Sequence, residues 1–218
     1  GRGGGDWHSA VPTRESRTAE LLGRFYGEET KRKLLSGDLA EVGQSVRLGD
    51  AVYTLDDAVY KDGTVYASGV IRPAEDANVV LLAEDYSVND PAGYLLFYGE
   101  EEIPDDAPTY AELAQERGAK ILHVDAIANG VLEENGELNA SSIGYGALPQ
   151  RDGTIRFFFE FEGGESEIVR AEKYEVSVYI ANWEVTPEGE WLREEPENTW
   201  LYEDWTVTVE PQMKEDGK

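Results

Sequence analysis

The chain has 218 residues, of which 19 are Lys or Arg and 45 are Asp or Glu, so its formal net charge is −26 at pH 7. This excess of acid disfavours binding to nucleic acid or to anionic lipid headgroups, because both need clustered basic side chains. With 40% hydrophobic and 11% aromatic residues the chain can form a core, and with no cysteine it has neither disulfides nor thiolate chemistry.

The charge is divided unevenly along the chain. Residues 1–50 hold eight basic and eight acidic residues, so the entire negative charge lies beyond residue 50. A neutral leading segment therefore precedes an acidic body. An acidic surface keeps a protein soluble and tolerates a cationic partner, but it does not identify one.

The chain opens with the Gly-rich residues 1–5, and its only methionine is Met213. We therefore expect that a signal or membrane segment upstream of Gly1 has been removed. The sequence itself has no stretch of about 20 apolar residues, the length that spans a membrane.

Residues 13–35 have a helical pattern. Thr13 or Ser16 can cap the start, and Ser36–Asp38 should end the helix. Gly27 weakens the middle, so the segment forms either one helix or two short ones, and it either docks on the body or acts as a stalk. The apolar residues share one face at a spacing of three and four: Leu21, Leu22, Phe25 and Tyr26.

The body carries turn signals typical of β-hairpins. Asp-Gly and Asn-Gly pairs accept the positive φ of tight turns, and here they lie between apolar runs. The turns are predicted at residues 61–64, 134–137 and 151–154, with a looser one at Pro187–Gly189.

Alternation of apolar residues predicts the strands after residue 150. Ile155, Phe157, Phe159 and Phe161 share one face, and the even positions of 174–180 share another. Trp183 and Val185 then continue on odd positions, which predicts a β-bulge or a change of sheet near residues 181–182. The final strand contains Leu201, Trp205, Val207 and Val209, and Trp183 and Trp205 take core positions.

Earlier strands are expected at about residues 51–56, 65–72, 78–83, 93–98 and 120–127. One helix interrupts them over Tyr110–Arg117, capped by Thr109 and ended by Gly118. Many short strands without a βαβ rhythm predict a mostly β fold, an antiparallel immunoglobulin-like β-sandwich with an N-terminal helical segment and one short inserted helix. The expected divisions are a lead-in with a helix (1–45), the sandwich domain (46–211) and a disordered tail (212–218).

The sequence contains no catalytic motif that we can identify. Its two histidines are His8, in the lead-in, and His123, on a strand beside Ile121 and Ile127, and no Gly-x-Ser-x-Gly elbow is present. A glycosidase would need two converging carboxylates, which 45 acidic residues could supply by chance. Calcium could bind clustered acidic residues, but none follows a calcium-loop pattern and solvated loops are favoured, so no metal or cofactor is predicted. Those clusters are Glu84–Asp85, Asn89–Asp90 and Glu100–Asp106.

Aromatic residues near the C-terminal hairpin are the candidate binding residues. Trp191 and Trp200 flank residues 192–199, and Tyr202 follows closely. Exposed rings of this kind stack on sugars or form protein interfaces, whereas inward-facing rings belong to the core.

Residues 52–60 (VYTLDDAVY) and 62–73 (DGTVYASGVIRP) form a strand, a turn and a long strand. This stretch resembles the opening of the extracellular immunoglobulin-like domain of membrane-bound, anti-sigma-factor-like proteins of Firmicutes, which are Gram-positive bacteria. The aromatic stretch 200–209 suits the same layout. The resemblance implies an ectodomain of unknown function, tethered by a linker to one transmembrane helix, and it supplies no catalytic residues.

We therefore expect a non-catalytic, extracytoplasmic sensing or interaction domain of a membrane-anchored regulator at the cell surface. Its partner would be a protein or a glycan, and it would meet the membrane only through a segment absent from this chain. The alternatives are a secreted or cell-surface carbohydrate-binding module that uses Trp191 and Trp200, and a hydrolase that uses paired carboxylates.

Overall fold

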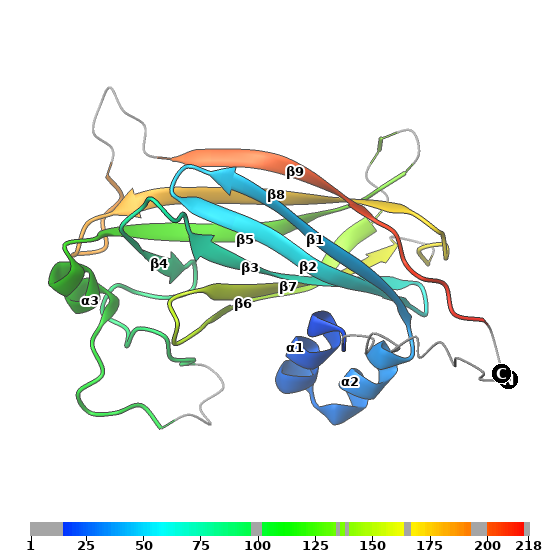
Figure 1. Ribbon diagram of the computed structural model, residues 1–218, viewed down its shortest axis with the longest axis horizontal. Coiled ribbons are helices and arrows are strands. Elements are labelled where there is room, and N and C mark those ends of the chain that lie inside the picture. Colours follow the sequence, from blue (N-terminus) through cyan, green and yellow to red (C-terminus); the bar gives the residue numbers. More distant parts are fainter. Residues whose placement is uncertain are drawn as a thin grey trace, which may run out of the picture.

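The computed structural model describes residues 15–96, 102–133, 136–137, 140–163, 167–192 and 200–215. They form two packed β-sheets with three helices, which confirms the predicted mostly β sandwich (Figure 1). The first sheet has the order β1-β2-β3-β7-β6 and the second the order β4-β5-β8-β9. The first sheet consists of β1 (Asp38–Leu48), β2 (Ala51–Lys61), β3 (Thr64–Pro73), β7 (Ile155–Gly163) and β6 (Ala140–Pro149). The second consists of β4 (Val79–Ala83), β5 (Lys120–Leu132), β8 (Tyr174–Val185) and β9 (Leu201–Val209).

One strand pair departs from the antiparallel prediction. β4 and β5 run parallel, with Val79 opposite Lys120 and Ala83 opposite Val124. Parallel neighbours need a long crossover connection. The helix α3 (Tyr110–Arg117) lies in that connection, so it returns the chain to the start of the next strand.

The strand order of the sandwich differs from that of immunoglobulin constant domains. The first three strands form one meander in a single sheet. In immunoglobulin constant domains the third strand instead belongs to the sheet opposite the first two. The structure thus shares the two-layer architecture of those domains with a different strand order.

The predicted turns lie where the Gly pairs place them. Asp62 and Gly63 have φ values of 48° and 79° in the β2–β3 hairpin, and Gly153 has a φ of 85° between β6 and β7. The looser turn is also present, since the Thr186 amide donates to the Glu190 carbonyl at 2.7 Å. Asn135 lies outside the described residues.

The Phe-rich strand β7 uses both of its faces. Phe157, Phe159 and Phe161 are buried between the sheets, as predicted. Phe158 points the other way, and it is fully buried because the N-terminal helices cover it. An extra apolar residue on the outer face of a strand therefore marks a docking surface.

The helical segment forms two helices, α1 (Arg17–Tyr26) and α2 (Glu28–Leu35). They separate at Gly27, whose φ of 111° is rarely open to other residues. The Ser16 side chain caps α1, as predicted, by accepting from the Ala19 amide at 3.1 Å. The segment docks on the sandwich and is not a free stalk. Its contacts form one cluster: Ala19, Leu21, Leu22 and Leu34 with Val59, Tyr66, Leu148 and Phe158.

The sandwich extends beyond the expected range 46–211 at both ends. β1 begins at Asp38, inside the expected lead-in. The Gln212 amide donates to the Leu39 carbonyl at 2.8 Å, so the start of the expected tail lies beside β1. Asp38 holds this corner: it forms a two-pronged ion pair with Arg170 at 2.6 and 2.9 Å and accepts from the Lys214 amide at 2.8 Å.

The strand β8 corrects a further prediction. Its pairing with β9 runs without a shift from Tyr174 to Asn182, so the bulge predicted near residues 181–182 is wrong. The shift lies instead on β5, between Ala128 and Gly130. No helix within the described part of the chain is long and apolar enough to cross a membrane.

Candidate functional site: an aromatic cavity on the second sheet

A cavity of about 350 Å³ opens on the outer face of the second sheet. Seven described residues line it, of which five are apolar or aromatic and two are acidic. We call it the aromatic cavity. It is lined by Glu84, Asp125, Tyr179, Ala181, Trp183, Trp191 and Trp200.

Strand alternation explains why these side chains meet. Val178 and Ile180 of β8 are fully buried between the sheets, so Tyr179, Ala181 and Trp183 face outward. Ala181 lies directly opposite Asp125 on one side and Tyr202 on the other. The floor of the aromatic cavity is therefore built by β5 and β8, and β9 lies beside β8.

Trp183 differs from its predicted place. The sequence pattern assigned it to the core, but it is only partly buried and lines the aromatic cavity. The odd-numbered apolar positions that suggested a bulge arise because the outer face is itself covered here. Trp205, the other Trp predicted to be in the core, is buried at 8% exposure, as predicted.

The predicted binding residues come together in this place. Trp191 and Trp200 line the cavity, and their rings meet edge to face at 5.9 Å and 88°. Tyr202 is not a lining residue, but its ring lies 5.4 Å from that of Trp200 and stacks at 6.2 Å on Tyr179. Trp191 is positioned by a backbone bridge to Val185 at the end of β8.

The polar part of the cavity is a pair of carboxyl groups. Asp125, in the middle of β5, shares a hydrogen bond with Glu84, which directly follows β4. Burial, followed by the charge and the hydrogen bond of Glu84, raises the pKa of Asp125 to about 7. The negative charge of Glu84 disfavours a second charge beside it, so below about pH 7 the Asp125 carboxyl group holds a proton.

The floor is braced from inside the sandwich. The buried Tyr53 of β2 donates its hydroxyl hydrogen to the Ala181 carbonyl at 2.7 Å. The side-chain Nδ2 of Asn182 donates to the Leu48 carbonyl at 3.0 Å. Both bonds join the two sheets directly behind the cavity, which fixes the part of β8 that carries its side chains.

His123 has a packing role beside the cavity. Its ring stacks on Trp183 at 5.0 Å and 19°. Burial lowers the pKa of His123, so the ring is neutral at pH 7. Its contact with Trp183 supports the wall of the cavity and supplies no ligand atom to it.

The sequence analysis missed the two acidic residues as site residues. Glu84 appeared only in an acidic cluster considered for calcium, and Asp125 was not singled out. A signal was available for Asp125: an acidic residue in the middle of a predominantly apolar strand, at the same parity as His123. Within the described ranges no group of three or more acidic or His residues could hold a metal ion.

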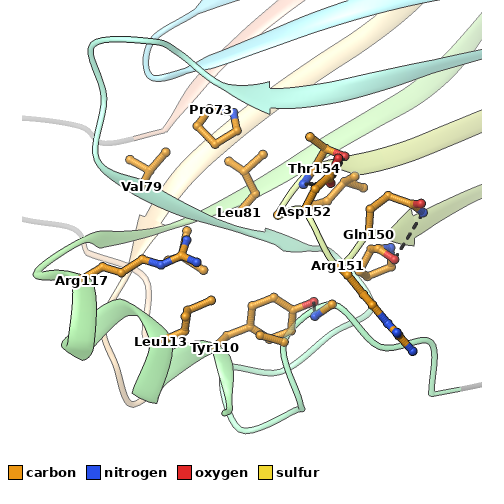
Figure 2. Close-up of a pocket in the computed structure, with 16 residues that line it drawn as sticks. Pro73, Val79, Leu81, Tyr110, Leu113, Arg117, Gln150, Arg151, Asp152 and Thr154 are labelled. Carbon is orange, nitrogen blue, oxygen red and sulfur yellow. Dashed lines mark hydrogen bonds between the residues drawn. The ribbon is translucent and has the colours of Figure 1, made fainter. Parts of the chain in front are cut away.

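A second cavity lies between α3, β4 and the β6–β7 turn (Figure 2). It has a volume of only about 90 Å³, well below the usual ligand site. Several of its polar groups bind one another, since Asp152 accepts from the Thr154 hydroxyl at 2.6 Å and the Tyr110 hydroxyl accepts from the Gly93 amide at 3.2 Å. This cavity is a packing seam.

A third cavity, also of about 350 Å³, lies by the β1 bulge and contains Asp56. Asp56 Oδ2 is buried without a hydrogen bond among the described residues. Its charge is nevertheless offset, because guanidinium nitrogens of Arg17 and Arg156 each lie 3.6 Å away. The aromatic cavity is therefore the best candidate site.

We compared the chain with known protein families, characterised proteins and solved structures. No family model, characterised protein or solved structure matches this chain. The resemblance of residues 52–73 to an anti-sigma-factor-like ectodomain therefore stays a prediction. The site has to be interpreted from its own chemistry.

Proposed function

We propose that this protein is a non-catalytic binding domain that takes a sugar ring of a glycan into the aromatic cavity. The observation that carries the proposal is the meeting of Trp183, Trp191 and Trp200 around one pair of carboxyl groups. Aromatic faces pack on the C–H face of a sugar, while carboxyl oxygens accept from its hydroxyl groups. A volume of about 350 Å³ is in the range of small-ligand sites.

The geometry favours binding over hydrolysis. A glycosidase places its two carboxyl groups on either side of the scissile bond, about 5 Å or more apart. Glu84 and Asp125 are instead hydrogen-bonded to each other on one side of the cavity. The pair is suited to hold a polar group of a ligand.

The proposed setting is extracellular. On the resemblance of residues 52–73, we propose that the domain is the sensing part of a membrane-anchored regulator, tethered by a segment upstream of this chain. The full-length gene tests this part: a hydrophobic span upstream of Gly1 is expected, and a native start close to Gly1 without one would contradict the anchored setting but leave the glycan proposal standing.

Binding to a glycan array, followed by titration of intrinsic Trp fluorescence, tests the glycan proposal. Trp191→Ala and Trp200→Ala should each weaken binding roughly tenfold, since each removes a stacking ring. Tyr145→Ala is the matched control, because Tyr145 is an exposed aromatic residue on the other sheet. The bound glycan should be recovered intact. An array without any bound glycan, or cleavage of the glycan, would contradict the proposal.

A further inference from the structure

The chemistry of the aromatic cavity says more about its ligand. The seven described residues that line it include two acids, and none of the seven is Lys, Arg or His. The charges around the acids have the same sign: Asp85 adds to the raised pKa of Asp125, and Asp125 and Asp204 both act on Tyr179. The nearest basic group on β5, Lys120, lies 4.0 Å from Glu184. Among the residues that the structure describes, those that line the cavity therefore contribute negative charge only.

We infer that the bound sugar is an amino sugar, whose ammonium group binds between the carboxyl oxygens of Glu84 and Asp125 while its ring stacks on the Trp side chains. This inference rests on the proposed function and names the class of sugar. An ammonium group has three N–H donors and no acceptor, which matches the carboxyl oxygens that Glu84 and Asp125 offer as acceptors. Charge-assisted hydrogen bonds to carboxylates are also stronger than those from a neutral hydroxyl group.

The aromatic walls suit the same ligand. Indole faces attract cations, so Trp183 beside the acid pair favours an ammonium group over a neutral one. Trp191 and Trp200, whose rings are perpendicular, line the same cavity, so each can offer an aromatic face or edge to the sugar ring that carries the ammonium group.

Binding of the ammonium group displaces a proton. In the free protein the Asp125 carboxyl group, hydrogen-bonded to Glu84, holds a proton at pH 6, and the ammonium group takes the place of that proton between the oxygens. Each binding event therefore takes up one protonated ligand and releases one proton to the buffer. Affinity should therefore rise with pH from 5 to 7, as the pair loses its proton to solvent more readily.

Isothermal titration calorimetry of the full chain at pH 6 tests the inference with three probes. These are a glucosamine trimer, an N-acetylglucosamine trimer and choline. We expect the glucosamine trimer to bind at least roughly tenfold more tightly than the N-acetylated one, which has the same ring and no charge. Repeating the titration in two buffers of different ionisation enthalpy should show about one proton released.

Variants that remove one carboxyl charge without a large change of side-chain shape test the role of the acid pair. Glu84→Gln and Asp125→Asn should each reduce affinity for the glucosamine trimer roughly tenfold, and each should weaken binding of the N-acetylated trimer by a smaller factor, because that trimer loses only a neutral hydrogen bond. Glu84 is exposed, so its variant should fold normally. Glu20→Gln, which makes the same change on the exposed face of α1, is the control and should have no effect.

The outcomes distinguish this inference from the proposed function. Equal binding of the two trimers would overturn the inference and leave the glycan proposal intact. Choline binding as tightly as the glucosamine trimer would overturn the inference, because the cavity would then recognise an ammonium group alone. Failure of every glycan on the array would overturn both proposals.

Discussion

The carboxylate of Asp57 accepts a 2.5 Å hydrogen bond from the hydroxyl group of Thr18, which is 39 positions away in the sequence. The same carboxylate accepts from the backbone amides of Arg17 at 2.7 Å and Thr18 at 3.0 Å. The first amides of a helix have no partner within the helix. A side chain of β2 thus completes the N-terminus of α1 and ties the helical segment to the sandwich.

Asp57→Ala should lower the free energy of unfolding by about 2–4 kcal/mol, because several buried donors lose their acceptor and α1 loses a cap. Urea denaturation measures this loss, and hydrogen exchange should show faster opening of α1. Asp105→Ala removes an exposed carboxylate as a control and should change little. Unchanged exchange in α1 would mean that the carboxylate does not hold the helix.

Phe158→Ala tests the docking of both helices. Phe158 is fully buried on the outer face of β7, with its ring 4.9 Å from that of Phe25. Removing it should cost about 3–5 kcal/mol and raise hydrogen exchange across residues 17–35. Tyr145→Ala on the adjacent strand is the control, since Tyr145 is 62% exposed. A helical segment that behaved as a free stalk would leave stability unaltered.

Gly69→Ala should destabilise the first sheet. A Cβ atom at this position would lie 2.0 Å from the Thr54 carbonyl oxygen and 2.4 Å from the Phe157 ring. Because one of these neighbours is backbone, relief requires movement of strands, and we expect a loss of at least about 1–3 kcal/mol in urea denaturation. Gly144→Ala is the control, because its Cβ would meet only the Glu160 side chain, at 3.2 Å. An equal loss of stability in the two variants would contradict the close approach of Gly69 to Thr54 and Phe157.

The carboxyl group of Asp125 should make stability depend on pH. Its pKa is raised to about 7, whereas an unfolded chain has an Asp pKa of about 3.9. Between these values the folded state binds the proton and the unfolded state does not, so stability falls as pH rises from about 4 to about 7. Asp125→Asn should remove this component of the decline in melting temperature.

The control for the melting temperatures is a variant in which Asp125 is still present. Asp105→Asn removes one exposed carboxylate and should follow the original pH dependence. Carbon-13 NMR of the Asp side chains gives a direct check, since one carboxyl group should titrate near pH 7. Identical pH curves for the original protein and Asp125→Asn would refute the raised pKa.

Local patterns were enough to predict much of the fold. The Asp62–Gly63 hairpin, the Ser16 cap, α3 and the alternation of Phe157 with its neighbours depend on a few adjacent residues, and each is present. The parallel pairing of β4 with β5 could not be predicted in this way. It depends on how α3 carries the chain back, which no local pattern records.

The site was predictable only in part for the same reason. Trp191 and Trp200 were found because they lie close together in sequence at the end of a strand. Glu84 and Asp125 are 41 positions apart and meet because β4 and β5 are neighbours. Trp183 was misplaced because the outer face of β8 is covered by side chains that follow it in the chain, so its apolar character resembled that of a core residue.

The corner held by Asp38 has a mechanical consequence. Arg170 and Lys214 both bind Asp38, and the Lys214 ammonium group donates to the Leu35 carbonyl at the end of α2 at 2.7 Å. A pulling force applied between α2 and residue 214 would load these few polar contacts first. They would break before the ladders of either sheet were sheared, and the aromatic cavity on the second sheet would keep its shape while the corner opened.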